Sequence, residues 1–96
     1  MNTIQIADLA ALLKSISHPF RLQILCLLQD KEMTVGEISR AIKTTDANIS
    51  QHLSILRNQG IIGTRKQANF IYNRITDDRV TMLIETMQKL FCNIKE

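Results

Sequence analysis

Apolar residues recur every three or four positions near the start of the chain, which is the spacing of one face of a helix. We predict a first helix over residues 4–16, with an apolar stripe formed by Ile6, Leu9, Leu13 and Ile16. Pro19 suits the first turn of a second helix, predicted over residues 19–29. Because this second helix is apolar on nearly all sides, we expect it to form the buried centre of the domain.

The middle of the chain has the pattern of two short helices joined by a tight turn. Thr34 and Glu37 match a capping box that begins the first of them. A three-residue connection, 43–45, leads to a second helix over residues 46–58, and Gly60 lies just beyond it, where a C-cap glycine is common. The residues predicted to face inward are Ile49, Leu53 and Leu56. Two helices joined in this way form a helix-turn-helix unit.

The pattern then changes to two β-rich runs, 61–66 and 70–75, which predict a hairpin with residues 67–69 between its strands. Asp77 opens a last helix. Its apolar residues at helical spacing are Val80, Leu83, Ile84, Met87, Leu90, Phe91 and Ile94. The expected fold is therefore mainly α with a β-hairpin wing, a winged helix-turn-helix, in one domain spanning residues 1–96.

The charge distribution adds a candidate function. Of 96 residues, 45% are apolar and 22% charged, which fits an ordinary globular protein and argues against a disordered tail. Residues 34–75 carry six basic and two acidic side chains, whereas the remainder carries six basic and seven acidic ones. A basic middle between near-neutral ends is typical of nucleic-acid binding. Ordinary solvated surface charge is the alternative at this stage.

Two further observations concern location. No apolar run approaches the roughly 20 residues that span a bilayer, and the first residues lack the pattern of a secretory leader. We therefore expect a cytoplasmic protein with no membrane partner. In a reducing cytosol, Cys26 and Cys92 are not expected to form a permanent disulfide, which leaves buried thiols, a redox sensor or metal ligands.

Polar side chains gather on the second helix of the helix-turn-helix unit, the helix that enters the DNA major groove in such units. Arg65 and Lys66 on the wing are placed to reach backbone phosphates. The predicted DNA-contacting residues are Thr45, Asn48, Ser50, Gln51, His52, Arg57, Arg65 and Lys66. A merely solvated polar face is the alternative. His18, by contrast, is expected to cap or fill the turn before the second helix.

Two segments, SHPFRLQIL at residues 17–25 and NISQHLSIL at residues 48–56, resemble the ArsR/SmtB family of bacterial repressors, and the order of elements matches over the whole chain. The resemblance implies a homodimer joined through its first and last helices. It also implies binding to double-stranded operator DNA with an inverted repeat, and release by an inducer. The wing tip at residues 67–69 departs from the glycine-containing basic turn that is usual in the family.

Many members of that family sense metals through Cys-x-Cys on the first helix of the helix-turn-helix unit, or through His and carboxylates on the last helix. Residues 37–42 contain no cysteine here, and the last helix contains no histidine, so both ligand sets are incomplete and no metal or cofactor is expected. Cys26 within ILCLL and Cys92 directly after Phe91 instead resemble the two thiols of sulfide- and redox-responsive members. In those proteins a persulfide or an oxidant links the thiols within one subunit and the operator is released.

Several alternatives stay open. Cys26 could be a small core residue whose burial raises its pKa. Cys92 lies off the apolar stripe of its helix and is expected to be the more accessible thiol. A thiol enzyme with Cys92 as nucleophile lacks a recognisable triad or glycine-rich phosphate loop. A metal-responsive repressor is the second choice within the regulator class, and an interaction module that does not read DNA is a further one.

Overall fold

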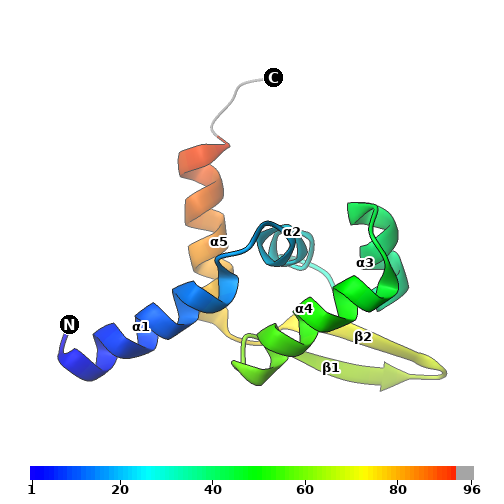
Figure 1. Cartoon of the computed structure of the whole chain (residues 1–96), viewed down its shortest axis with the longest axis horizontal. Coiled ribbons are helices and arrows are strands. Elements are labelled where there is room, and N and C mark those ends of the chain that lie inside the picture. The colour runs from blue at the N-terminus through cyan, green and yellow to red at the C-terminus, as the bar shows by residue number, and fades with distance from the viewer. Residues whose placement is uncertain (93–96) are drawn as a thin grey trace.

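The computed structural model describes residues 1–92. In chain order, these residues form α1 (Thr3–Ile16), α2 (Pro19–Leu27), α3 (Val35–Ile42), α4 (Asp46–Asn58), β1 (Ile62–Gln67), β2 (Phe70–Ile75) and α5 (Asp78–Phe91). In Figure 1, α2, α3 and α4 pack above the hairpin, and α1 and α5 extend away from this body. The predicted class, mainly α with a β-hairpin wing, is confirmed.

The helices begin where a polar side chain accepts a hydrogen bond from the first turn. Thr34 and Glu37 form the predicted capping box of α3. The Nδ1 atom of His18 accepts from the backbone N–H of Phe20 at 3.1 Å, which confirms that this histidine caps α2. The N-cap residues of the five helices are Asn2, His18, Thr34, Thr45 and Asp77.

The end of α4 is a Schellman motif, which explains the glycine predicted there. Gly60 has a φ of 74°, a conformation that favours glycine. Its N–H donates to the carbonyl of Arg57 at 3.0 Å, and the N–H of Ile61 donates to the carbonyl of Leu56 at 3.0 Å. Because Ile61 belongs to this helix end, β1 begins at Ile62, one residue later than predicted.

Two helices are shorter than predicted. α2 ends at Leu27, because the chain turns at Leu28, its C-cap, toward the polar segment before α3. α5 ends at Phe91, with Cys92 as its C-cap. Ile94, the last residue of the predicted apolar stripe, lies outside the described residues.

The hairpin has a tighter turn than predicted. Gln67 pairs with Phe70, so two residues connect the strands, and the first of them, Ala68, has a φ of 55°. Asn73 of β2 fixes the hairpin to the body by pairing with the backbone of Met33. Its Nδ2 also donates to the Met33 carbonyl at 3.2 Å. This bond explains how a polar side chain can be only 2% exposed.

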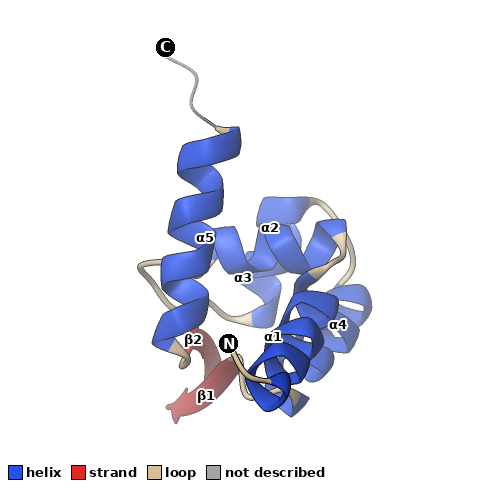
Figure 2. Cartoon of the chain, turned by 90° about the vertical axis from the view of Figure 1, so that its left-hand side faces the viewer, coloured by secondary structure: helices blue, strands red, loops and turns tan. Residues whose placement is uncertain are grey.

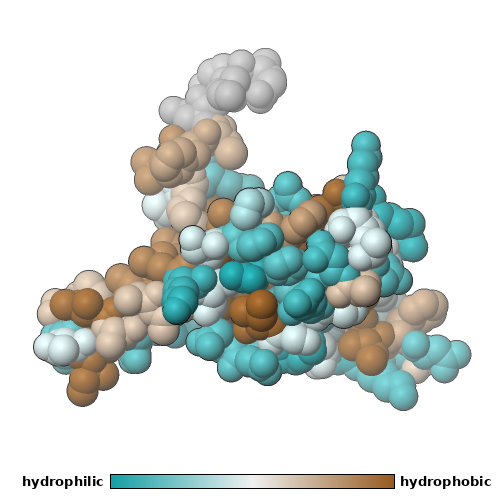
Figure 3. Space-filling view, viewed as in Figure 1, coloured by the Kyte–Doolittle hydropathy of each residue, from teal (hydrophilic) through white to brown (hydrophobic). Residues whose placement is uncertain are grey.

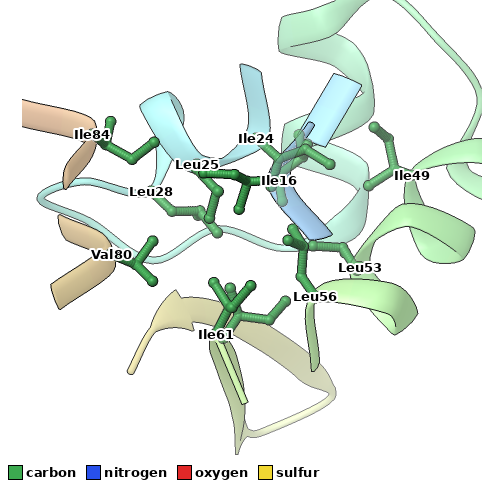
Figure 4. Close-up of a cluster of buried hydrophobic side chains, with 12 residues drawn as sticks. Ile16, Ile24, Leu25, Leu28, Ile49, Leu53, Leu56, Ile61, Val80 and Ile84 are labelled. Atoms are coloured by element: carbon green, nitrogen blue, oxygen red, sulfur yellow. The ribbon is translucent and has the colours of Figure 1, made fainter. Parts of the chain in front are cut away.

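α2 lies at the centre of the core, as predicted (Figure 4). Ile24 and Leu25 are fully buried, in one cluster with side chains of α1, α4 and α5. The predicted inward-facing residues of α4 are also buried. Burial does not extend around the whole helix, because the neighbouring elements cover only part of its circumference. Leu22 and Leu27 are half-buried, and Cys26 is exposed.

α1 and α5 carry apolar side chains that their own chain does not cover. Figure 2 shows the two helices projecting from the body in different directions, and Figure 3 shows apolar surface along α1 and toward the end of α5. Of the predicted α1 stripe, Ile16 is buried, whereas Ile6, Leu9 and Leu13 are exposed. Within residues 1–92, no helix is long and apolar enough to cross a membrane.

Candidate nucleic-acid interface and thiol pair

The turn between α3 and α4 is held by hydrogen bonds at both helix ends. Lys43 adopts the left-handed conformation and ends α3. The hydroxyl of Thr45 accepts from the N–H of Asn48 at 3.1 Å and begins α4. Across the turn, the hydroxyl of Ser39 donates to the carboxylate of Asp46. These bonds fix the direction of α4 relative to α3, as a helix inserted into a groove requires.

The exposed face of α4 contains Ser50 and Gln51, two of the residues predicted to contact DNA. Three further residues share this face and are not among the predicted DNA-contacting residues. They are Ala47, Ser54 and Asn58, of which Ser54 is half-buried and the others are exposed. Their positions opposite the buried stripe follow from helical spacing, so the sequence contains the signal that identifies them.

Three other predicted residues have partners within the chain. Asn48 is half-buried, and its Nδ2 donates to the hydroxyl of Thr44 at 3.1 Å. Thr45 is occupied as the N-cap. Arg57 is exposed, and its Nη2 donates to the hydroxyl of Ser54 at 3.2 Å. Direct DNA contacts from Asn48, Thr45 and Arg57 stay predictions, and they require these side chains to exchange or share a partner.

The prediction that His52 faces DNA is wrong. Its side chain is buried, with its ring centroid 4.4 Å from that of His18 and 5.6 Å from that of Phe20. His52 follows Ile49 by three residues and precedes Leu56 by four, which places it on the buried face. Helical spacing therefore identifies this position as internal, although its polar side chain suggests exposure.

On the wing, Arg65 is held in place and Lys66 is exposed. The guanidinium of Arg65 forms an ion pair with Glu32, and its centre lies 4.8 Å from the centroid of the Tyr72 ring. Hydrogen bonding to Arg65 lowers the pKa of the Glu32 carboxyl. A phosphate contact from Arg65 stays a prediction, and it requires the phosphate to compete with Glu32.

The two thiols lie at the ends of neighbouring helices. Cys26 is the second-last residue of α2, and Cys92 caps the C-terminus of α5. Both side chains reach the surface. Partial burial of its sulfur raises the pKa of Cys26, a hydrogen bond with Gln88 opposes this rise, and the charge of Cys92 adds to it.

A metal site is not evident in the described part of the chain. Residues 1–92 contain no group of three or more His, Cys, Asp or Glu side chains arranged to hold a metal ion. The two histidines contact each other on the buried side of α4, and the two cysteines lie at the ends of α2 and α5. These side chains therefore do not combine into a four-ligand zinc-type site.

Comparisons with known proteins agree with this geometry. The family model described as "Bacterial regulatory protein, arsR family" matches residues 18–64. The transcriptional activator HlyU of Vibrio cholerae is 37% identical over 94% of this chain and 83% of its own length. Its structure superposes with a TM-score of 0.89, covering 96% of this chain and 99% of that one, and a structure of reduced HlyU gives 0.88, covering 92% and 93%.

Two other relatives extend the comparison. The biofilm growth-associated repressor of Agrobacterium fabrum is 37% identical over 93% of this chain and 76% of its own length. The homodimeric winged helix-turn-helix DNA-binding domain Mb0332 of Mycobacterium bovis is 28% identical, with a TM-score of 0.81, covering 91% of this chain and 81% of that one. These relatives are DNA-binding regulators, not enzymes. The chain therefore belongs to the arsR family of bacterial regulatory proteins and is a transcriptional regulator with a winged helix-turn-helix fold.

Proposed function

We propose that this chain is a homodimeric cytoplasmic repressor that binds an inverted-repeat operator through α4. It releases the operator when Cys26 and Cys92 become linked within one subunit by reactive sulfur or an oxidant. The observation that carries this proposal is the position of the two thiols. Cys26 lies near the end of α2, which is part of the DNA-reading body, and Cys92 lies at the end of α5, which projects from that body.

The dimer is supported by the apolar surfaces of the projecting helices. Ile6 and Leu13 on α1 are 55% and 42% exposed, and Leu90 on α5 is 71% exposed. A hollow between α1 and the beginning of α5 is lined by Leu9, Leu12 and Leu83. A second copy supplies the cover that these apolar residues lack. The homodimeric Mycobacterium bovis relative supports the same assembly.

The DNA-contacting role of α4 leads to a prediction with two variants. Gln51→Ala should cost on the order of 1–3 kcal/mol in operator binding and reduce discrimination between bases, because an exposed amide on α4 can read a base edge. Lys66→Ala should weaken binding to all duplexes and flatten the salt dependence, because it removes a phosphate contact. Fluorescence anisotropy with operator and scrambled duplexes measures both. Equal loss on both duplexes for Gln51→Ala contradicts base reading by this residue.

The proposed chemistry has two balanced routes. A peroxide takes two electrons and two protons from the thiol pair and leaves a disulfide and two water molecules. Alternatively, a sulfane sulfur atom adds to one thiol as a persulfide. Attack by the second thiol on the protein-bound sulfur then forms the disulfide and releases hydrogen sulfide. If a second sulfane sulfur extends the persulfide before this attack, release of hydrogen sulfide leaves a trisulfide, which tolerates a longer separation of the two helices than a disulfide does.

Partial burial raises the pKa of Cys26 above its ordinary value of 9.0, so at neutral pH it is ionised to a smaller extent than an unperturbed cysteine and reacts more slowly as the first nucleophile. We therefore assign the first reaction to Cys92, whose side chain is exposed at the end of α5. Cys26 then attacks the modified sulfur. This second step is favoured because the two groups already belong to one folded chain.

The test treats the reduced protein with a polysulfide donor, with hydrogen peroxide, or with zinc or cadmium ions. The linked form is then identified by intact mass, and binding to an operator duplex is measured in parallel. We expect polysulfide or peroxide to produce a Cys26–Cys92 bridge and release DNA, and the metals to have little effect. Release by metal without any change in mass contradicts the thiol switch and favours the metal-responsive alternative.

A further inference from the structure

The strongest feature outside the thiol pair is a cluster of part-buried side chains on the inner side of α4. It joins His52 of α4, His18 of the turn between α1 and α2, and Phe20 and Arg21 of α2. The ring centroids of the two histidines are 4.4 Å apart, and that of Phe20 lies 5.6 Å from that of His52. The chain contains only these two histidines.

The hydrogen bonds of the cluster identify the histidine ring nitrogens that carry no proton. The Nη1 atom of Arg21 lies 3.2 Å from Nδ1 of His52, and a guanidinium can only donate, so this ring nitrogen accepts and carries no proton. The Nδ1 atom of His18 likewise accepts, from the backbone N–H of Phe20 at 3.1 Å. A proton added to Nδ1 of His52 therefore removes the bond to Arg21 and places two positive charges against each other.

Arg21 connects the cluster to α1 as well. Its Nε donates to the carbonyl of Ser15 at 2.5 Å, in the last turn of α1. One guanidinium thus bonds simultaneously to α1 and to α4 while belonging to α2. Through these two hydrogen bonds, Arg21 connects α4, the helix proposed to read DNA, to α1.

We propose that this cluster is a proton-sensitive brace for α4, so that acidification below neutral pH weakens operator binding by protonating His52. The inference rests on the proposed operator binding through α4. His52 is a positioning residue in this scheme, because it is buried and acts through the placement of the helix. No ligand enters the cluster, and the proton is the effector.

Three influences on His52 all lower its pKa. Burial, followed by the charges of His18 and Arg21, lowers the pKa of His52 below its ordinary value of 6.5. α1 contributes the Ser15 carbonyl through Arg21. Within the part of the chain that is described, α3 and β1 also contact α4, but no carboxylate from them stabilises a charged His52. The folded state therefore favours the neutral ring, and this contribution to stability, full above pH 6.5, is lost as the pH falls below it.

The test measures affinity between about pH 7.5 and about pH 5.5, the range in which histidine titrates, at constant ionic strength. The probe is a duplex that the wild-type protein enriches from a randomised library at the higher pH. We expect a roughly tenfold loss of wild-type affinity over this range, with one proton per subunit controlling it. A histidine that faced phosphates would produce the opposite sign, so an affinity that rises on acidification overturns the proposal.

Two variants test whether the pH dependence of affinity comes from His52. His52→Asn places an amide oxygen near the position of Nδ1 but cannot titrate, so the ratio of affinities at the two pH values should fall toward one. His18→Asn retains an N-cap side chain for α2 and removes one of the charges that lower the pKa of His52, so the loss of affinity should persist with its midpoint at a higher pH. A ratio unchanged in His52→Asn contradicts the proposal, as does a ratio abolished by His18→Asn alone.

A titration without DNA separates failure of the brace from failure of operator binding. In the free protein, NMR should show the His52 imidazole titrating below 6.5, with amide signals of α4 shifting at the same midpoint. A His52 ring that titrates at or above 6.5 overturns the brace even if DNA is bound. If no duplex is enriched from the library, the proposed operator binding fails, and the NMR titration still decides whether the brace exists.

Discussion

Leu90→Glu is expected to convert the proposed dimer into monomers and to raise the dissociation constant of the operator complex by on the order of a hundredfold. The leucine is 71% exposed on α5, so the fold of a single chain does not depend on it. In a symmetric dimer each substitution occurs twice, and each buried unpaired carboxylate costs several kcal/mol. A monomer contacts only one half-site, so the loss of assembly becomes a loss of operator affinity.

The matched control is Lys89→Gln, which changes the net charge by the same amount at the adjacent exposed residue of α5. It should stay dimeric. Size-exclusion chromatography with light scattering measures assembly, and circular dichroism checks that both variants retain their helices. Leu83→Glu tests the same surface nearer the core, where the leucine is half-buried. If Leu90→Glu and Leu83→Glu are both folded dimers, the interface does not include α5.

Most of the fold follows from local signals in the sequence. The capping box at Thr34, the glycine at position 60 and the spacing of Ile49, Leu53 and Leu56 each predict a feature that the structure contains. These signals depend on residues within one turn of each other. The two-residue hairpin turn could not be predicted in the same way, because Ala68 adopts a positive φ that its residue type disfavours.

The candidate site was less predictable because its decisive contacts join distant parts of the chain. Arg21 and His52 are 31 residues apart, and Glu32 and Arg65 are 33 apart. No local spacing shows that Arg21 forms a hydrogen bond with His52, or that Arg65 forms an ion pair with Glu32. The exposure of Cys26 depends likewise on which sides of α2 the neighbouring helices cover. Residue type alone suggested a DNA contact for His52 and left burial open for Cys26.

The thiol switch predicts that either single substitution, Cys26→Ser or Cys92→Ser, leaves the operator bound after treatment with polysulfide or peroxide. Wild type should lose affinity by roughly 5–150-fold under the same treatment, the range typical of coupling between two sites. The physical reason is that a bridge pulls the end of α5 toward α2. Because we place α5 in the dimer interface, this movement changes the separation of the two α4 helices, which an operator fixes at about 34–36 Å.

The single variants separate this mechanism from simple modification of one thiol. Cys26→Ser retains the exposed Cys92, so it still accepts a persulfide or a sulfenic acid but cannot close the bridge. Untreated, both variants should bind like the reduced wild type, because serine replaces sulfur at exposed positions without opening a cavity. Reductant should restore binding of the treated wild type, because a bridge is reversible and no other change is required. Release of treated Cys26→Ser means that modification of Cys92 alone is the signal, and release of the double serine variant removes thiol chemistry from the mechanism altogether.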